Sequence, residues 1–176
     1  MRPVYGDRAI AEKIKERIIT AAANDDELQS VIVANTLTYK MLIGIFGQFL
    51  KEQYGEGAGG LDMKYGAYIP MVNAVRMLAL QEGIHASSTL QRIEQLKQRG
   101  RVDPEKAERW KAAFQFFMKM RAKAENKSVG RFYTTSGVVK MDQLNKLERM
   151  ELKHHLKTGR ELQRNIRKAA GKQGTE

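Results

Sequence analysis

The sequence predicts an all-α fold, an antiparallel bundle of five to six amphipathic helices. Apolar residues recur three and four positions apart through most of the chain, which is the spacing of one helix face. Helix-capping residues, glycine and proline separate these periodic segments. Alternating apolar and polar stretches, the pattern of paired strands, are absent from the sequence. The 176 residues are enough for one such domain with its own hydrophobic core.

Two helices are expected before the first long loop. Asp7 is the predicted N-cap of a helix that ends near Asn24, with isoleucines four apart at positions 10, 14 and 18. Asn24-Asp25-Asp26 interrupts the pattern and starts a second helix, which we expect to end near Tyr54. Its apolar or half-apolar positions are Leu28, Val31, Ile32, Tyr39, Leu42, Phe46 and Phe49.

The middle of the chain predicts a loop and a third helix. The glycine-rich residues 55–60 are the clearest loop, and residues 61–66 form a short irregular or extended stretch. Pro70 suits the first turn of the third helix, which Gly83 ends. One face of that helix collects Tyr68, Met71, Val72, Val75, Leu78 and Ala79.

The second half predicts three more helices. Ser88-Thr89-Leu90-Gln91 has the pattern of a capping box for a fourth helix that ends at Gly100. Asp103-Pro104-Glu105 opens a fifth helix, with a buried stripe of Trp110, Ala113, Phe114, Phe117 and Met120. A loop over 128–139 precedes a last helix from about 142 to 170, in which Gly159 is a close-packing point or a weak spot. Its apolar positions are Leu144, Leu152, Leu156, Leu162 and Ile166. Residues 7–170 thus form a single helical-bundle domain, and 171–176 a disordered tail.

The composition excludes several classes of protein. Cysteine is absent, which excludes a disulfide framework, a zinc–thiolate site and a cysteine nucleophile. No stretch reaches the roughly 18 to 20 apolar residues of a membrane span, and the N-terminus lacks the apolar segment of a signal peptide. We therefore expect a cytoplasmic protein with no membrane partner.

Positive charge is concentrated in the second half of the chain. The formal net charge is +11, but residues 1–96 carry −1, residues 97–141 carry +8 and residues 142–176 carry +4. A basic half favours nucleotides or an acidic protein face as partners. Solvent-exposed, lysine-rich helix faces explain it equally well. We do not expect nucleic acid, because the aromatic residues of this half fall at core spacing.

Residues that commonly carry catalysis are sparse. No phosphate-binding loop and no serine nucleophile elbow occur. His154 and His155 are adjacent, so on a helix they point about 100° apart and cannot share one metal ion. Arg149 and His154 resemble the Arg-x4-His arrangement of the helical RNases of the HEPN superfamily, in which histidine acts as acid or base. A helical RNase is therefore a remote alternative.

Residues 62–99 hold polar side chains in otherwise apolar surroundings. They are Asp62, Lys64, Asn73, Arg76, Thr89 and Arg92. Hydrogen bonds between helices explain them, with the stem of Arg76 buried and its head near solvent. They also suit a binding face, where two arginines receive phosphate or carboxylate in bidentate fashion.

Two runs in this region carry a family resemblance. They are Asp62-Met63-Lys64-Tyr65-Gly66-Ala67-Tyr68-Ile69-Pro70-Met71-Val72-Asn73-Ala74-Val75-Arg76-Met77-Leu78-Ala79-Leu80-Gln81-Glu82-Gly83-Ile84 and Ser88-Thr89-Leu90-Gln91-Arg92-Ile93-Glu94-Gln95-Leu96. They resemble the substrate-binding domain family of bacterial nucleotidyltransferase-like proteins, which are related to the uridylyl- and adenylyltransferases that regulate nitrogen metabolism. The match continues through 114–121 and 147–153 and covers most of 61–165.

The resemblance implies a substrate- or partner-binding domain of a signal-transduction protein that does not catalyse nucleotidyl transfer alone. Residues 1–6 are similar to the linker that leaves an upstream catalytic domain, which this chain lacks. That domain would bind Mg²⁺ and a nucleoside triphosphate, and this chain would need no cofactor. Arg76 and Arg92 would hold phosphate or an acidic protein substrate, Lys64 would add charge, and Asn73 and Thr89 would orient the ligand, on a face shared with Asp62.

A second function class is open from the sequence. The polar seam would then pack on the catalytic domain or on a second copy, and the chain would be a purely structural docking or dimerisation domain. A homodimer is therefore left open.

Overall fold

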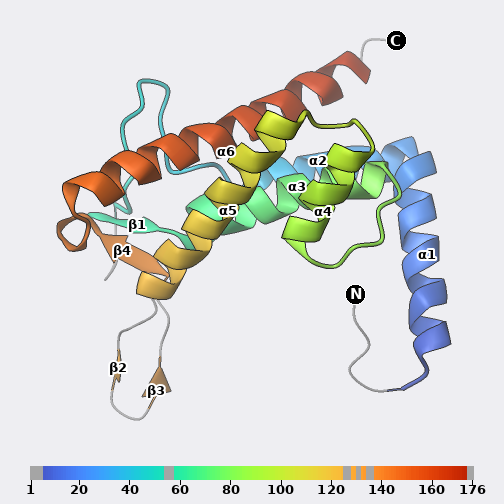
Figure 1. Ribbon diagram of the computed structural model, residues 1–176, viewed down its shortest axis with the longest axis horizontal. Helices are drawn as coiled ribbons and strands as arrows, with labels where there is room; N and C mark the ends of the chain where they lie inside the picture. Colours follow the sequence, from blue (N-terminus) through green and yellow to red (C-terminus); the bar gives the residue numbers. More distant parts are fainter. Residues whose placement is uncertain (1–5, 54–57, 125–127, 130–131, 134–136, 174–176) are drawn as a thin grey trace.

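Six helices pack together in the computed structural model, which describes residues 6–53, 58–124, 128–129, 132–133 and 137–173 (Figure 1). The predicted helical bundle is confirmed. The helices are α1 (Arg8–Asn24), α2 (Asp26–Thr38), α3 (Ile69–Gln81), α4 (Thr89–Gln98), α5 (Pro104–Ala124) and α6 (Lys146–Gln173). Most of the predicted linker 1–6 and residues 174–176 of the predicted tail lie outside the described residues. Residues 171–173 were predicted as part of the disordered tail, but they continue α6. None of the described helices is long and apolar enough to cross a membrane.

Short strands and short helical turns join the helices. The strands are β1 (Gly60–Asp62), β2 (Ser128–Val129), β3 (Phe132–Tyr133) and β4 (Val138–Lys140), and the turns are η1 (Lys64–Tyr68) and η2 (Met141–Gln143). β1 pairs antiparallel with β4, with Leu61 opposite Val139, and β2 pairs with β3. The predicted loop over 128–139 is thus partly wrong. Within this range, β4 pairs with β1, which lies far away in the sequence, and local sequence patterns do not reveal such a pairing.

The helix boundaries follow local chemistry. Asp7 accepts a hydrogen bond from the Ala9 amide and caps α1, as predicted. Asp103 accepts one from the Lys106 amide at the start of α5. The capping box predicted at Ser88 is wrong, because Ser88 is the N-cap of α4 but its side chain makes no capping hydrogen bond.

The second helix is much shorter than predicted. It ends at Thr38, and residues 39–53 form an extended hairpin loop in which Ile43 pairs with Phe49. The Leu42 amide donates to the Gly66 carbonyl (2.8 Å) and the Leu50 amide to the Leu42 carbonyl (3.1 Å). The backbone therefore finds partners outside a helix, although its apolar spacing suits one.

The core lies where α3, α5 and α6 meet. The predicted stripe of α5 is buried in full, as are the five predicted apolar positions from Leu144 to Ile166. Phe117, Met71, Leu152 and Val75 are among the fully buried side chains. Gly159 is a close-packing point, since a Cβ there would lie 2.3 Å from Cε of Met41.

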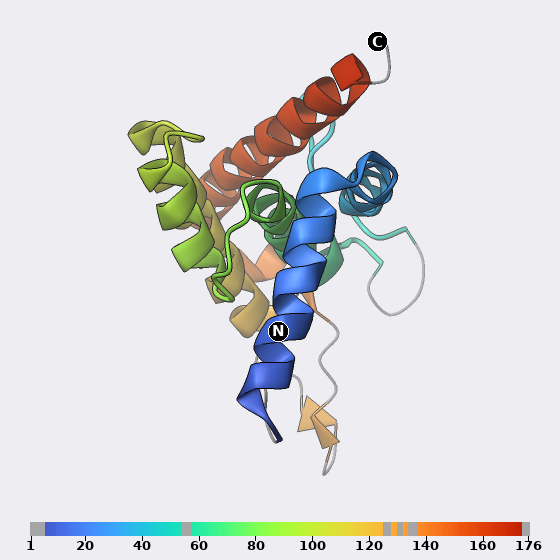
Figure 2. The same cartoon turned by 90° about the vertical axis from the view of Figure 1, so that its right-hand side faces the viewer.

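Helix α1 departs from this pattern. Only Ile19 and Ala22 of α1 are buried, while Ile10, Ile14 and Ile18 are 58%, 44% and 47% exposed. Figures 1 and 2 show the first turns of α1 extending away from the other helices. The isoleucine stripe is therefore a surface feature.

An ion-pair network on α4 and α5 predicts acid sensitivity. Hydrogen bonds from Lys111 and then Lys97 lower the pKa of Glu94 to about 2, and Lys111 also lowers the pKa of Glu108. A carboxylate with a lowered pKa stabilises the fold above its ordinary pKa of 4.5, and this stabilisation is lost as the pH falls towards 2. We expect Glu94→Gln to lower the melting temperature at pH 7 and to have a smaller effect at pH 3. Equal decreases of the melting temperature at pH 7 and at pH 3, measured by circular dichroism, would contradict the ion pairs that we assign to Glu94.

Candidate functional site: a cleft with two arginines

A cleft of about 420 Å³ opens between α1, the end of α3 and the start of α4. The basic residues of its lining are Lys15, Arg76, His85 and Arg92, and we call this cleft the arginine cleft. The rest of the lining is Ile18, Ile19, Leu80, Ile84, Ala86 and Ser87. Figure 2 looks onto this side of the molecule, with α1 in front. Two of the predicted site residues, Arg76 and Arg92, thus come together from different helices.

Arg92 is held by its own loop. Its Nε donates to the Ala86 carbonyl at 2.8 Å, which fixes the guanidinium against the segment before α4. Burial lowers the pKa of Arg92, and the nearby positive charge of Arg76 lowers it further. The two guanidinium groups therefore repel each other in a partly desolvated place. A bound anion would relieve that repulsion.

In the part of the chain that the structure describes, carboxylates lie only at the edge of the cleft. Nζ of Lys15 lies 3.5 Å from Oε2 of Glu12, and Nε2 of His85 lies 3.4 Å from Oε2 of Glu16. Both glutamates are on exposed parts of α1. Among the described residues, neither arginine has a carboxylate within ion-pair distance. A guanidinium can bind phosphate or carboxylate through two parallel hydrogen bonds.

Asn73 lies next to the cleft. It stands one helical turn before Arg76 on α3, and both line a second hollow of about 180 Å³ between α2 and α3. Arg76 therefore forms the ridge between the two hollows. Thr89, the first residue of α4, is buried and does not line the cleft, whereas Ser87 does.

Asp62 and Lys64 do not line the cleft. Oδ1 of Asp62 accepts hydrogen bonds from the amides of Lys64 and Tyr65, each at 2.9 Å, and so caps η1. Nζ of Lys64 lies 4.9 Å from the centre of the Tyr65 ring. Asp62 thus has a structural role at the junction of β1 and η1, and the single face predicted for all six residues is not formed around the cleft.

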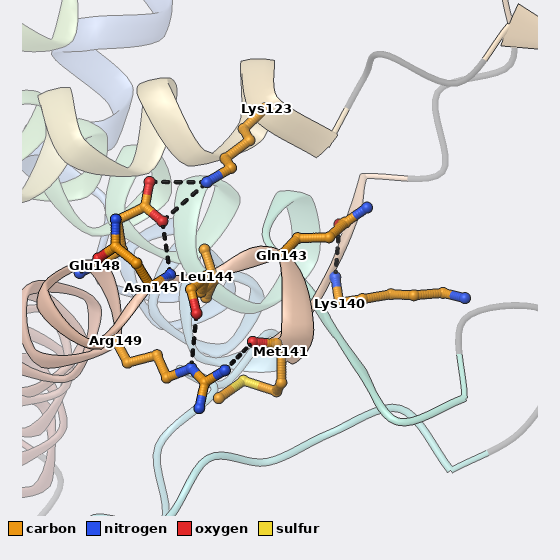
Figure 3. A network of polar contacts seen from close by, with 8 residues as sticks. All are labelled: Lys123, Lys140, Met141, Gln143, Leu144, Asn145, Glu148 and Arg149. Atoms are coloured by element: carbon orange, nitrogen blue, oxygen red, sulfur yellow. Dashed lines mark hydrogen bonds and ion pairs between the residues drawn. The ribbon is translucent and has the colours of Figure 1, made fainter.

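Arg149 of the RNase alternative lies at the start of α6, within a network of structural contacts (Figure 3). Arg149 donates from Nε to the Leu144 carbonyl (2.9 Å) and from a terminal nitrogen to the Met141 carbonyl (2.7 Å). Glu148 and Asn145 cap each other's amides, and Lys123 pairs with Glu148 at 2.8 Å. These contacts give Arg149 the role of fastening η2 to α6, which disfavours an RNase role for it.

Lys15, His85 and Ser87 were not predicted as site residues. Lys15 has no distinguishing signal, because it lies in an ordinary amphipathic helix. His85 stands alone in the turn after α3, where its position close to Arg92 depends on the path of the loop. Only the packing of α1 on α3 brings Lys15 to the cleft.

One comparison with known proteins identifies the family. The family described as "putative nucleotidyltransferase substrate binding domain" matches residues 26–170. The chain belongs to this family. No curated protein and no solved structure matches it. The matched range of this substrate-binding domain includes Asn73, Arg76, His85 and Arg92 of the site, whereas α1 with Lys15 precedes it.

Proposed function

We propose that this substrate-binding domain serves a nucleotidyltransferase-like regulatory protein and that its arginine cleft receives the anionic part of the substrate or partner. The observation that carries the proposal is the pair of Arg76 and Arg92, which share one cleft without a carboxylate partner among the described residues. The family match supports the nucleotidyltransferase context. The ligand is a nucleotide or an acidic protein surface.

The residues of the cleft have different roles in this proposal. Arg92, held by the Ala86 carbonyl, is a fixed donor, and Arg76, on the exposed ridge, closes onto the anion from the other side. Asn73 orients a ligand that extends into the neighbouring hollow. Lys15 adds positive charge at the edge of the cleft, and His85 adds an imidazole there. Asp62, Lys64 and Thr89 do not line the cleft, so they take no part in this proposal.

The chemistry belongs to another domain in this account. Nucleotidyl transfer uses carboxylates that hold Mg²⁺ at the phosphates. Among the described residues, no group of three or more histidine, aspartate or glutamate side chains could hold a metal ion. We assign the catalytic Mg²⁺ to a separate domain, and we assign the arginine cleft of this chain to the anionic groups of the nucleotide or of an acidic partner.

The exposed stripe of α1 suits the contact with that catalytic domain. Ile10, Ile14 and Ile18 form one apolar line, and Ile18 also lines the arginine cleft. A domain that packs on this stripe would cover one side of the cleft. The ligand would then lie between the two domains, a common position for binding sites.

A docking or dimerisation domain is the second candidate, and the same stripe favours it. An exposed apolar line on a protruding helix also suits a second copy of the chain. In that case Ile14→Asp would abolish the dimer, and Arg76→Ala would lower stability or assembly without changing ligand affinity. Sedimentation measures whether either variant loses the dimer, and a ligand titration of Arg76→Ala measures whether its affinity changes. Together the two measurements separate the candidates.

Calorimetric titration with the Mg²⁺ complexes of ATP, UTP, CTP and GTP, at low and at moderate salt, tests the proposal. A saturable one-site heat that survives moderate salt and disappears in Arg92→Ala supports the cleft as a binding site. A weak heat that vanishes with salt would reflect only the basic surface. The absence of heat, both for the chain alone and for its complex with the catalytic domain, would overturn the nucleotide-binding form of the proposal.

A further inference from the structure

The hairpin loop between α2 and β1 ends in two exposed apolar side chains. The Gly47 amide donates to the Gly44 carbonyl at 3.0 Å and closes a tight turn, with Ile45 and Phe46 at its centre. Ile45 is 80% exposed and Phe46 is 93% exposed. Figure 1 shows the loop as the cyan segment that projects past α6. Full exposure of a neighbouring Ile–Phe pair leaves a large apolar surface in water, which often marks a contact site.

The hairpin is fastened to α6, so the tip is held in place. Gln163 of α6 accepts from the Met41 amide (3.4 Å) and donates to the Tyr39 carbonyl (2.7 Å). Arg160 donates to the Gly44 carbonyl, directly at the turn. Gly159 leaves the space that Met41 occupies. These contacts give the exposed tip a fixed position beside α6.

A stripe of cations runs along α6 beside the hairpin. Lys153, Lys157, Arg160, Arg164 and Arg167 are spaced four, three, four and three residues apart, which places them on one helix face. Lys153 and Lys157 lie next to Gly47, while Arg160, Arg164 and Arg167 line a hollow of about 310 Å³ with Ile45. None of the five has a carboxylate of the described residues within ion-pair distance. We call these five residues the basic stripe.

We propose that the basic stripe and the Ile45–Phe46 tip together bind the surface of an anionic lipid bilayer. The cations match anionic headgroups, and the exposed apolar pair of the tip suits the boundary between headgroups and acyl chains. Such surface binding requires no membrane-spanning helix. It departs from the expectation that the protein has no membrane partner, which rested on the lack of a spanning segment and of a signal peptide in the sequence. It shares no residue with the arginine cleft and does not depend on the function proposed there.

The composition of the tip favours lipid over nucleic acid. Single-stranded nucleic acid is bound by aromatic rings on which successive bases stack, with cations along the backbone. The turn offers one aromatic ring, and the neighbouring Ile45 has no aromatic face. An aliphatic and an aromatic side chain side by side instead suit insertion among acyl chains. Binding should be reversible, because a short apolar tip needs help from the cations.

Vesicle flotation with the full chain tests this inference. The probe is a vesicle with about one third phosphatidylglycerol in phosphatidylcholine, compared with pure phosphatidylcholine. We expect binding to the anionic vesicles only. Phe46→Ser should weaken it about tenfold, and the pair Arg164→Gln and Arg167→Gln should do so as well. Met118→Ser and Arg109→Gln, exposed changes on α5, are the matched controls and should bind like the wild type.

A fluorescent variant reports the insertion directly. Tryptophan at the exposed tip, in Phe46→Trp, should shift its emission to the blue on anionic vesicles, whereas the wild type, with its buried Trp110, should not change. Equal binding by Phe46→Ser and the wild type, or no preference for anionic vesicles, would overturn the inference. Tight binding to a single-stranded RNA homopolymer without vesicle binding would overturn it in favour of nucleic acid.

Discussion

Phe117→Ala should lower the free energy of unfolding by about 3 to 5 kcal/mol. Phe117 is fully buried in α5, and α5 packs against α6, η1 and β4. The truncated side chain loses its transfer free energy and leaves a cavity that these elements can fill only in part. Because each kcal/mol shifts the melting temperature of a domain of this size by about 2–4 °C, we expect a decrease of roughly 6 to 20 °C.

Urea denaturation followed by circular dichroism measures this effect. Met118→Ala is the matched control, since the next residue of the same helix is 48% exposed and its truncation should change stability by less than about 0.5 kcal/mol. Similar losses for the two variants would contradict the orientation of α5 in the bundle.

Loss of either cleft arginine should reduce anion binding strongly. A hydrogen bond to a charged group contributes about 1.5–3 kcal/mol, so Arg76→Ala and Arg92→Ala should each weaken binding of the Mg²⁺–nucleotide complex roughly tenfold to a hundredfold. Arg92→Lys keeps the charge but lacks the planar fork, so it should restore only part of the affinity.

Two comparisons separate this effect from a change in fold. Arg76 is exposed, so Arg76→Ala should keep the melting temperature of the wild type while it loses affinity. Arg109→Ala removes one positive charge from the exposed face of α5 and should leave affinity unchanged. Equal losses for Arg76→Ala and Arg109→Ala would mean that only the net charge matters.

Local sequence patterns were sufficient for the helices that carry the core. The stripe from Trp110 to Met120 repeats at helical spacing between clear start and stop signals, and all of it is buried. Residues 39–53 were wrongly assigned for a physical reason. Their apolar side chains also repeat at helical spacing, but Gly44 and Gly47 and the backbone bond from Leu42 to Gly66 select a hairpin. The partner in that bond is distant in sequence, so no local pattern contains it.

The candidate site was only partly predictable. Arg76 and Arg92 were identified as polar groups in apolar segments, and the structure brings them into one cleft. Asp62 and Lys64 belong to the same sequence run, but the turn η1 directs them to local contacts. Lys15 could not be identified, because its position depends on Ile19 and Ala22, which dock α1 on the bundle.

Amide chemical shifts measured during a titration test by location whether the anionic ligand binds in the arginine cleft. With the isotope-labelled chain and the Mg²⁺ complex of ATP, we expect saturable shifts at Arg76, His85, Ser87 and Arg92 that persist at moderate salt. Shifts confined to the basic stripe of α6, or shifts that disappear as salt screens the surface charge, would contradict binding in this cleft.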